Sequence, residues 1–469
     1  MSTPLSRRDV LRATALAAGG YALHRLAPAS FAGLPEGIPG APKVPQDPSV
    51  SVLNPRDRVP LSFIIDDSTV LVNMGHFCMP QFAAAWPQRV EYKRPWKDWP
   101  REIPNDFVRE FGEWCAGNGV RGKWSVVPNP ACVGWLDREL PGWSKADLRD
   151  GLKVVREVMA PNWDIHPEMI THTRVIDLKT GRPLDPMGDA TMENSYPPKN
   201  ANISADYLAT YIAYALKILK NCDIACEGAT TPGGFGNADR SALSLAMRDA
   251  VSDVFAPEIP HYFKYIADGD EPIKPILEHV EGLDTDHPRL VDNVPGGTGD
   301  WLGSWDGDRP PLPDKYATPD ASAGRVVELI ERGGPAVLFA HWAGFYSCGK
   351  RDGFEAIKRV ITSINTKYAD RTVWMKLSEL SRYWAAKELT RIERANSAAT
   401  LTAPFACPAF TLKLTGAKAA APAVSLEGKP VVLSEVGDNK AMKPGTWQRR
   451  GGDVVVCLDL AKGKTQVSV

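Results

Sequence analysis

Residues 62–67 read Ser62-Phe63-Ile64-Ile65-Asp66-Asp67, an apolar run that ends in two carboxylates. A short, bounded apolar run predicts a buried strand, and similar runs return at residues 123–127 and 336–340. Helical patterns lie between them, for example at 204–220. Strands that alternate with helices are typical of a parallel sheet with crossover helices. The sequence therefore predicts an α/β fold, an incomplete (β/α) barrel of roughly seven or eight units.

The sequence pattern differs before and after this predicted barrel. We expect residues 61–395 to form the barrel catalytic domain. The short alternating runs at 410–414 and 454–458 predict a small antiparallel β domain over residues 400–469. Residues 33–60 are rich in proline and predict an extended lead-in along the domain surface.

The N-terminus resembles a twin-arginine signal peptide over residues 1–32. Arg7 and Arg8 precede a mildly apolar Ala/Gly-rich stretch. The resemblance implies export to the periplasm or the medium. The eight cysteines show no paired spacing, so we expect most to be buried free thiols, and any disulfide pairing stays open.

Composition limits the partners of the protein. The chain has 469 residues and a formal net charge of −1, with no basic tract to oppose phosphates, which argues against nucleic acid. No long apolar run follows the N-terminus, so no stable membrane insertion is expected after signal cleavage. Tryptophan is abundant, and flat aromatic rings suit the apolar faces of sugars. A carbohydrate partner is expected, whereas the sequence does not indicate an oligomeric state.

Polar side chains follow several of the predicted strands. The loops at the C-terminal ends of parallel strands converge on one face, where reactive groups gather. Two imidazoles and one carboxylate suit a borderline divalent cation and leave positions open for substrate, and zinc is the expected ion. The predicted metal ligands are Asp67, His166 and His172. The predicted substrate contacts are Trp301, Trp305 and Thr231.

The order Asp-Asp, His…His, a Pro/Gly loop and Leu338-Phe339-Ala340-His341 resembles the polysaccharide deacetylase (NodB-like) group of the glycoside hydrolase/deacetylase superfamily. The resemblance covers most of residues 60–385. It implies that Asp66 is the general base and His341 the general acid, with Asp67 binding the metal. The family spaces its two histidines four residues apart, whereas His166 and His172 are six apart.

Three functions remain open at this point. The first is removal of acetyl groups from a poly- or oligosaccharide by a metal-dependent hydrolase. The second is glycoside hydrolysis by paired carboxylates, for which Glu227, Glu168 and Asp66 are the candidates. The third is a non-catalytic glycan-binding protein that retains the sugar-binding groove but has lost the metal.

Overall fold

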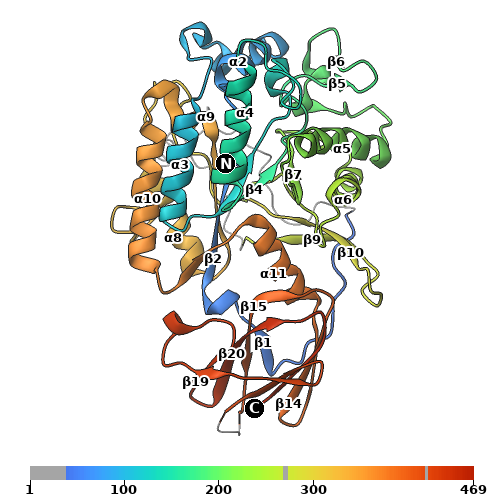
Figure 1. The fold of residues 1–469 in the computed structure, drawn as a ribbon, viewed down its shortest axis with the longest axis vertical. Coiled ribbons are helices and arrows are strands. Elements are labelled where there is room, and N and C mark those ends of the chain that lie inside the picture. The colour runs from blue at the N-terminus through green and yellow to red at the C-terminus, as the bar shows by residue number, and fades with distance from the viewer. Residues whose placement is uncertain (1–37, 268–272, 418–420) are drawn as a thin grey trace, which may run out of the picture.

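A computed structural model describes residues 38–267, 273–417 and 421–469. Figure 1 shows an upper part, in which helices surround a central set of strands, and a lower part made of β-strands. The predicted export signal at residues 1–32 lies outside the described residues. Within the described ranges, the helices are too short or too polar to span a bilayer.

The central strands of the upper part form two hydrogen-bonded groups. The first has the order β11-β2-β3-β4, with β12 also paired to β2, and all of these pairs are parallel. The second has the order β7-β8-β10-β9, in which only β9 runs antiparallel to its neighbour. The strands are β2 (Val59–Asp66), β3 (Gly122–Ser125), β4 (Trp163–His166), β7 (Gly228–Thr230), β8 (His261–Phe263), β9 (Ile276–Glu281), β10 (Arg289–Asn293), β11 (Ala336–His341) and β12 (Thr372–Trp374).

Isolated contacts join the two groups on both sides. Glu168, just after β4, forms a parallel bridge with Thr230 of β7. The backbone N–H of Gly297, just after β10, donates to the carbonyl of Val337 in β11 at 2.7 Å. The predicted α/β fold with a parallel sheet is therefore confirmed. Its closure into a barrel stays a prediction.

Amphipathic helices pack around the strands. In α3, Phe107, Phe111 and Cys115 are buried on one face. Ser204 caps α5 as an N-cap should, since its side chain accepts a hydrogen bond from the N–H of Tyr207. The helices are α2 (Met74–Ala85), α3 (Asn105–Gly117), α4 (Lys145–Val154), α5 (Ala205–Asn221), α6 (Arg240–Phe255), α7 (Pro313–Tyr316), α8 (Arg325–Glu331), α9 (Trp342–Tyr346), α10 (Asp352–Tyr368) and α11 (Leu377–Leu389).

Strand β2 places the two aspartates. Phe63 and Ile65 pack into the large core shared with the helices, whereas Ile64 belongs to an inner apolar cluster with Phe263. Successive side chains of a strand point to opposite faces. Asp66 therefore faces the same inner side as Ile64.

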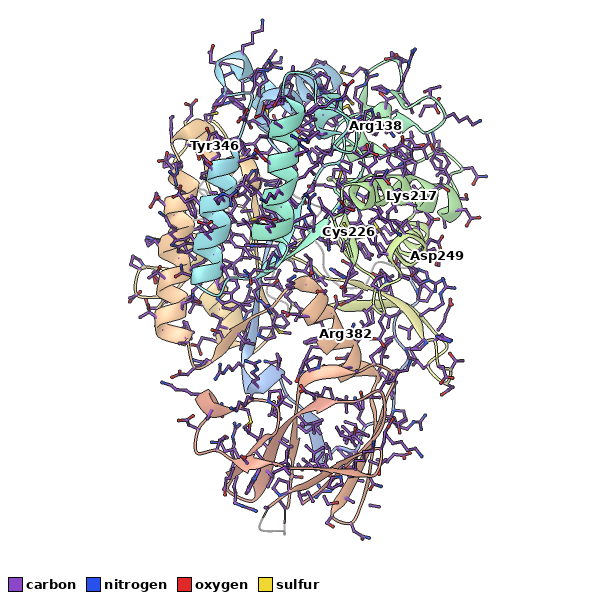
Figure 2. All side chains as sticks on the ribbon, in the orientation of Figure 1. Arg138, Lys217, Cys226, Asp249, Tyr346 and Arg382 are labelled. Carbon is purple, nitrogen blue, oxygen red and sulfur yellow. The ribbon has the colours of Figure 1, made fainter. Side chains whose placement is uncertain are left out.

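The lower part holds two five-stranded sheets around one apolar core. All pairs except β18 with β19 are antiparallel, which confirms the predicted C-terminal antiparallel structure. In the lead-in, β1 (Val50–Val52) pairs with β15. Arg382 of α11 donates to Glu258 and to the carbonyl of Ala406, and so lies between the two parts (Figure 2). The remaining strands are β13 (Arg391–Ala395), β14 (Ala398–Ala403), β15 (Cys407–Leu414), β16 (Ala423–Leu426), β17 (Lys429–Val431), β18 (Ser434–Glu435), β19 (Thr446–Arg450), β20 (Asp453–Leu460) and β21 (Gly463–Ser468).

The eight cysteines all fall within the described residues, and each is a free thiol. Six of them are buried, and Cys132 and Cys348 are half-buried. Burial raises the pKa of Cys132 to about 11, so this thiol stays protonated at neutral pH.

Asp292 of β10 gives the protein a testable pH dependence. Burial raises the pKa of this carboxyl to about 8, although the nearby hydroxyl of Ser381 opposes the shift. A folded-state pKa above the unfolded value of 3.8 means that Asp292 stabilises the fold at low pH, and that this contribution is lost as the pH rises through about 8. We expect Asp292→Asn to raise the free energy of unfolding more at pH 9 than at pH 5, by about 1.4 kcal/mol or more, the value of one pKa unit, because the penalty grows from the unfolded pKa of 3.8 up to the folded pKa of about 8. Urea unfolding at both pH values measures this, and an equal effect at both would contradict the assignment.

Candidate metal centre and active site

Asp67, Glu168 and His172 bring three potential metal ligands together where β2 and β4 end. One donor atom of each lies within 4.8 Å of the other two. Nε2 of His172 is 3.1 Å from Oδ1 of Asp67, and its Nδ1 is 3.2 Å from Oε1 of Glu168. All three side chains are buried. Two buried carboxylates this close repel each other unless a proton or a cation offsets their charge.

The donor set fits a divalent cation. Within the described residues, Oδ1 of Asp67 and Nδ1 of His172 are buried, and their close contacts with His172 and Glu168 lack hydrogen-bond geometry, which is unusual for buried polar atoms. Two carboxylates and one imidazole are ligands that zinc and similar ions accept, with further positions left for substrate. These residues would therefore hold the ion that the sequence predicts, and zinc as its identity stays a prediction.

Without a cation, the positive charge would come from His172. Burial lowers the pKa of this imidazole, but the nearby carboxylates of Asp67 and Glu168 outweigh burial and raise the pKa to about 9. Burial also raises the pKa of Glu168, yet the positive charge of His172 beside it prevails and lowers the pKa to about 2. The cluster is thus built around a positive charge, which a metal ion or a proton supplies.

The backbone at the cluster is strained. Asp67 has φ 58° and His172 has φ 64°, in the left-handed region that costs a non-glycine residue about 1–3 kcal/mol. The N–H of Asp67 donates to Oε2 of Glu168 at 2.8 Å, which fixes the first of these residues. Buried Glu193 fixes the second, since it accepts the N–H of His172 at 2.6 Å and the hydroxyl of Tyr211 at 2.6 Å. Two of the three potential ligands thus have a strained backbone that hydrogen bonds to buried carboxylates maintain. Such strain is typical of functional sites.

Asp66 forms a buried ion pair with Lys123 of β3. Nζ of Lys123 also donates to Oγ of Ser125 at 2.7 Å and to the carbonyl of Ile65 at 3.3 Å. Burial, assisted by the charge of Glu168 and opposed by Lys123, raises the pKa of Asp66 to about 7. A carboxylate that titrates near neutrality is suited to exchange protons during catalysis.

Lys123→Met should destabilise the fold because it leaves the buried Asp66 without its partner. Removal of one member of a buried ion pair costs about 3–5 kcal/mol. We expect a decrease of this size in the free energy of unfolding at pH 8, and a smaller one below pH 6, where Asp66 takes up a proton. Urea unfolding measures it, with Lys217→Met at an exposed position of α5 (Figure 2) as the control. Equal stability of the two variants would show that the pair is not needed.

His341 ends β11 in register with Asp66 of β2. Its Nδ1 is 2.7 Å from Oδ2 of Asp300, and its backbone N–H donates to the same oxygen at 3.2 Å. Burial lowers the pKa of His341, but Asp67 and the hydrogen bond with Asp300 outweigh burial and raise it to about 10. Because Asp300 accepts the proton on Nδ1, Nε2 is the nitrogen left for a reaction partner.

His166 is not a member of the cluster. It ends β4 with its side chain fully buried, its Nε2 2.9 Å from Nε2 of His261 and its Nδ1 3.3 Å from Oγ1 of Thr230. Burial holds its pKa well below the ordinary range. The structure therefore groups Glu168, and not His166, with Asp67 and His172. Glu168 and His172 are four residues apart, but the deacetylase resemblance implies histidines at both positions, so the glutamate departs from it.

Glu227 does not belong to the site either. It is exposed and directly precedes β7, so it lies at the N-terminal edge of the parallel strands. Glu168 lies at the opposite edge, where it bridges Thr230 at the end of β7. The structure therefore places Glu227 away from the cluster, because the strand starts after this residue and does not end near it.

The predicted substrate contacts differ in their surroundings. The ring of Trp305 lies 5.9 Å from that of His341, centroid to centroid, beside the candidate acid. The ring of Trp301 packs edge to face on Tyr316 at 4.8 Å. Thr231 is buried just after β7, and within the described residues its hydroxyl oxygen has no hydrogen-bond partner. Contact of all three with substrate stays a prediction.

Three residues that support the site were missed from the sequence. The sequence places Lys123 in a strand. Because side chains two residues apart lie on the same face of a strand, Lys123 and Ser125 could have been expected on the inner side with Asp66. Asp300 lies in a glycine-rich loop, and Glu193 lies 21 residues beyond His172. No local pattern links either of them to its partner.

No protein-family model matches the sequence, and no curated protein matches it. Among solved structures, an α-L-fucosidase is 12% identical with a TM-score of 0.28, over 89% of this chain and 98% of that one. An α-fucosidase of Thermotoga maritima is 11% identical with a TM-score of 0.28, over 89% and 97%. An endo-β1,6-glucanase is 10% identical with a TM-score of 0.27, over 92% and 94%. Likenesses this weak carry no argument about the fold or the activity of this chain.

Proposed function

We propose that the protein is a metal-dependent hydrolase that removes acetyl groups from an acetylated poly- or oligosaccharide. The observation that supports this most is the buried cluster of Asp67, Glu168 and His172, with Asp66 and His341 on the two paired strands beside it. The deacetylase resemblance implies Asp66 as the base, His341 as the acid and Asp67 and His172 as metal ligands, with His166 as the third ligand where the cluster has Glu168. The twin-arginine resemblance makes export from the cytoplasm part of the proposal.

A bound divalent cation would polarise the acetyl carbonyl and lower the pKa of a coordinated water. The protein's own side chains would carry out the proton transfers. Asp66, with a pKa of about 7, would take a proton from the attacking water, and its ion pair with Lys123 would hold the carboxylate in place before the transfer. Protonated His341 would deliver a proton from Nε2 to the leaving amine or alcohol, with Asp300 holding its other nitrogen.

Glycoside hydrolysis is the second candidate, and one observation favours it. The pKa of Asp66 is raised to about 7 and that of Glu168 is lowered to about 2, and a pair of carboxyl groups with separated pKa values can act as acid and nucleophile. However, Glu168 is held by the N–H of Asp67 and contacts His172, so it is engaged in the cluster.

Product analysis separates these functions. Purified protein is incubated with a panel of acetylated oligosaccharides, with and without a chelator, and both free acetate and new reducing ends are measured. The proposal predicts acetate release that the chelator abolishes and that added zinc restores. New reducing ends without acetate would favour glycoside hydrolysis. Tight binding with neither product would favour a glycan-binding protein.

A further inference from the structure

The turn that carries His172 directs three successive backbone N–H groups at one buried carboxylate. The N–H of Ile170 donates to Oε1 of Glu193 at 3.1 Å, and that of His172 donates to Oε2 at 2.6 Å. The N–H of Thr171, between them, donates to both oxygens at 3.2 Å. Successive N–H groups that converge in this way form a nest, a concavity that binds anions. The anion in the nest of residues 170–172 is the protein's own Glu193, whose side chain is fully buried.

Tyr211 of α5 supplies a further hydrogen bond to this carboxylate. Its hydroxyl donates to Oε1 of Glu193 at 2.6 Å and accepts the N–H of Ile176 at 3.1 Å. Ile176 begins β5 (Ile176–Asp177), which pairs with β6 (Arg182–Pro183). Since Tyr211 is also fully buried, the carboxylate in the nest is tied to a helix and to a strand.

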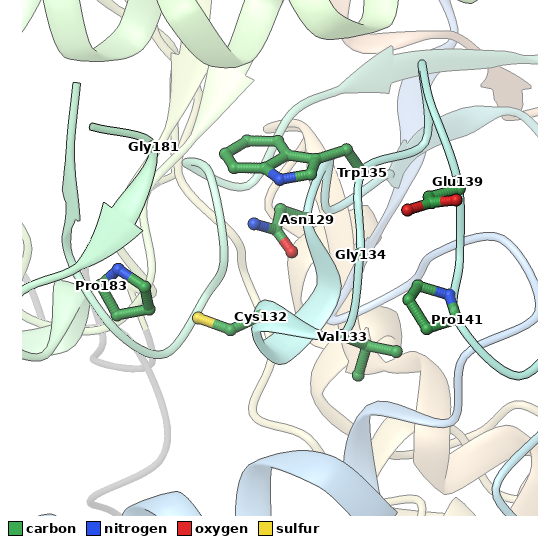
Figure 3. A pocket seen from close by; sticks show the side chains of 9 residues that line it. All are labelled: Asn129, Cys132, Val133, Gly134, Trp135, Glu139, Pro141, Gly181 and Pro183. Carbon is green, nitrogen blue, oxygen red and sulfur yellow. The ribbon is translucent and has the colours of Figure 1, made fainter. Parts of the chain in front are cut away.

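The carbonyl groups of the same turn are held separately. The N–H of Asn129 donates to the carbonyl of Ile170 at 2.8 Å, and the N–H of Ala131 donates to the carbonyl of Thr171 at 3.0 Å. Both donors belong to the loop between β3 and α4, where Asn129 also lines a pocket of about 250 Å³ (Figure 3). The two residues before His172 are thus fixed through their N–H groups and through their carbonyls.

The nest bears directly on the position of the His172 imidazole. This residue has φ 64°, and such a backbone conformation persists only where its surroundings hold it. The hydrogen bond from the N–H of His172 to Glu193 is the shortest of the nest at 2.6 Å. Because φ and ψ set the direction of a side chain, a relaxed turn would move the imidazole away from Asp67 and Glu168, which it now meets at 3.1 and 3.2 Å.

We propose that Glu193 is a positioning residue of the metal centre, which fills the backbone nest and thereby holds His172 in the orientation that binds the cation. The inference rests on the proposed function for the presence of that cation. Groups that orient a metal ligand without touching the metal typically contribute about 10- to 100-fold to metal affinity. Tyr211 supports the same role through its hydrogen bond to Glu193.

Zinc affinity and the absorption spectrum of the cobalt(II)-substituted protein test this role without requiring turnover. Both are measured at pH 8 for wild type, Glu193→Ala, Glu193→Gln and Tyr211→Phe, with a chelating dye as the competitor for zinc. The matched control is Glu278→Ala on β9. Glu278 is also fully buried and accepts the hydroxyl of Tyr262 at 2.6 Å, but it lies outside the metal centre. Circular dichroism establishes that each variant is folded.

We expect both Glu193 variants to bind zinc about 10- to 100-fold more weakly than wild type and to change the cobalt spectrum. Glutamine keeps the size of the side chain, but its amide NH₂ cannot accept an N–H, so half of the nest loses its acceptor. Tyr211→Phe removes one hydrogen bond and should weaken zinc binding about three- to ten-fold. Glu278→Ala should bind zinc as wild type does.

Chemical rescue separates the role of the carboxylate from the loss of packing. Formate can fill the nest that Glu193→Ala vacates, and we expect it to raise the zinc affinity of this variant about three-fold or more. Formamide has a similar size without the charge and should not do so. Wild type, whose nest is filled, controls for binding of formate to the metal. Equal rescue by formamide would show that Glu193 only fills space.

Wild-type zinc affinity in both Glu193 variants, or an equal loss in Glu278→Ala, would overturn the positioning role. A wild type that binds no zinc would overturn the proposed metal centre and this role together. Acetate release is measured separately. Weaker zinc binding by the Glu193 variants of a protein that releases no acetate would therefore support the positioning role and count against the deacetylase activity alone.

Discussion

Asp67→Ala is expected to leave the purified protein without bound metal and to lower kcat/KM for an acetylated oligosaccharide by about 10³-fold or more. Metal catalysis contributes several kcal/mol of transition-state stabilisation, and about 1.4 kcal/mol corresponds to a factor of ten. Asp67 is one of the three clustered ligands, and its Oδ1 lies 3.1 Å from Nε2 of His172, so its loss removes both a ligand and the charge partner of that imidazole. Elemental analysis and initial rates measure the two effects.

The control for this variant is Asp292→Asn. Asp292 is also fully buried in the α/β part, and its raised pKa of about 8 means that it is protonated at neutral pH, so asparagine mimics its neutral form. It should retain both metal and activity. If Asp67→Ala bound as much metal as this control, Asp67 would not be a ligand.

His341→Ala is expected to keep the metal but to lower kcat by about 10²–10⁴, the usual contribution of general acid–base catalysis. The proton on Nε2 is the one that His341 can give to a leaving group, because Nδ1 is bound to Asp300 at 2.7 Å. Substrates with a good leaving group, such as an acetylated phenol, need less protonation and should lose less activity. This comparison separates proton donation from a structural role.

His287→Ala, at an exposed position, is the control for His341→Ala. It should leave kcat and metal content unchanged. A kcat for His341→Ala within about two-fold of wild type would remove His341 from the mechanism. An equal loss on the good and the poor leaving group would show that His341 acts on something other than the leaving group.

The fold was predictable where local patterns are strong. The apolar run Ser62–Ile65 lies in β2, as predicted. The helical pattern at 204–220 corresponds to α5, for which Ser204 is the N-cap. The ends of strands that contain glycine were harder to predict. Strand β7 begins only at Gly228, so Glu227 lies before the strand and at the edge of the sheet opposite Glu168.

The site was predictable only in part, because its geometry depends on contacts that are distant in sequence. Asp67 and His172 meet as expected. The choice of the third ligand depended on where β4 ends. Since the strand ends at His166, that imidazole stays among the interior side chains, while Glu168 falls on the following turn and reaches Asp67. The supporting contacts of Asp300 and Glu193 depend on loops with no periodic pattern.

The central claim is that Asp67, Glu168 and His172 hold one divalent cation. Metal stoichiometry of wild type, Glu168→Gln and His166→Gln, each reconstituted with zinc and dialysed, tests it most directly. The account predicts about one zinc per chain in wild type and His166→Gln and nearly none in Glu168→Gln, as expected for four-coordinate binding that loses a ligand. Retention of zinc by Glu168→Gln, or its absence from wild type, would contradict the account.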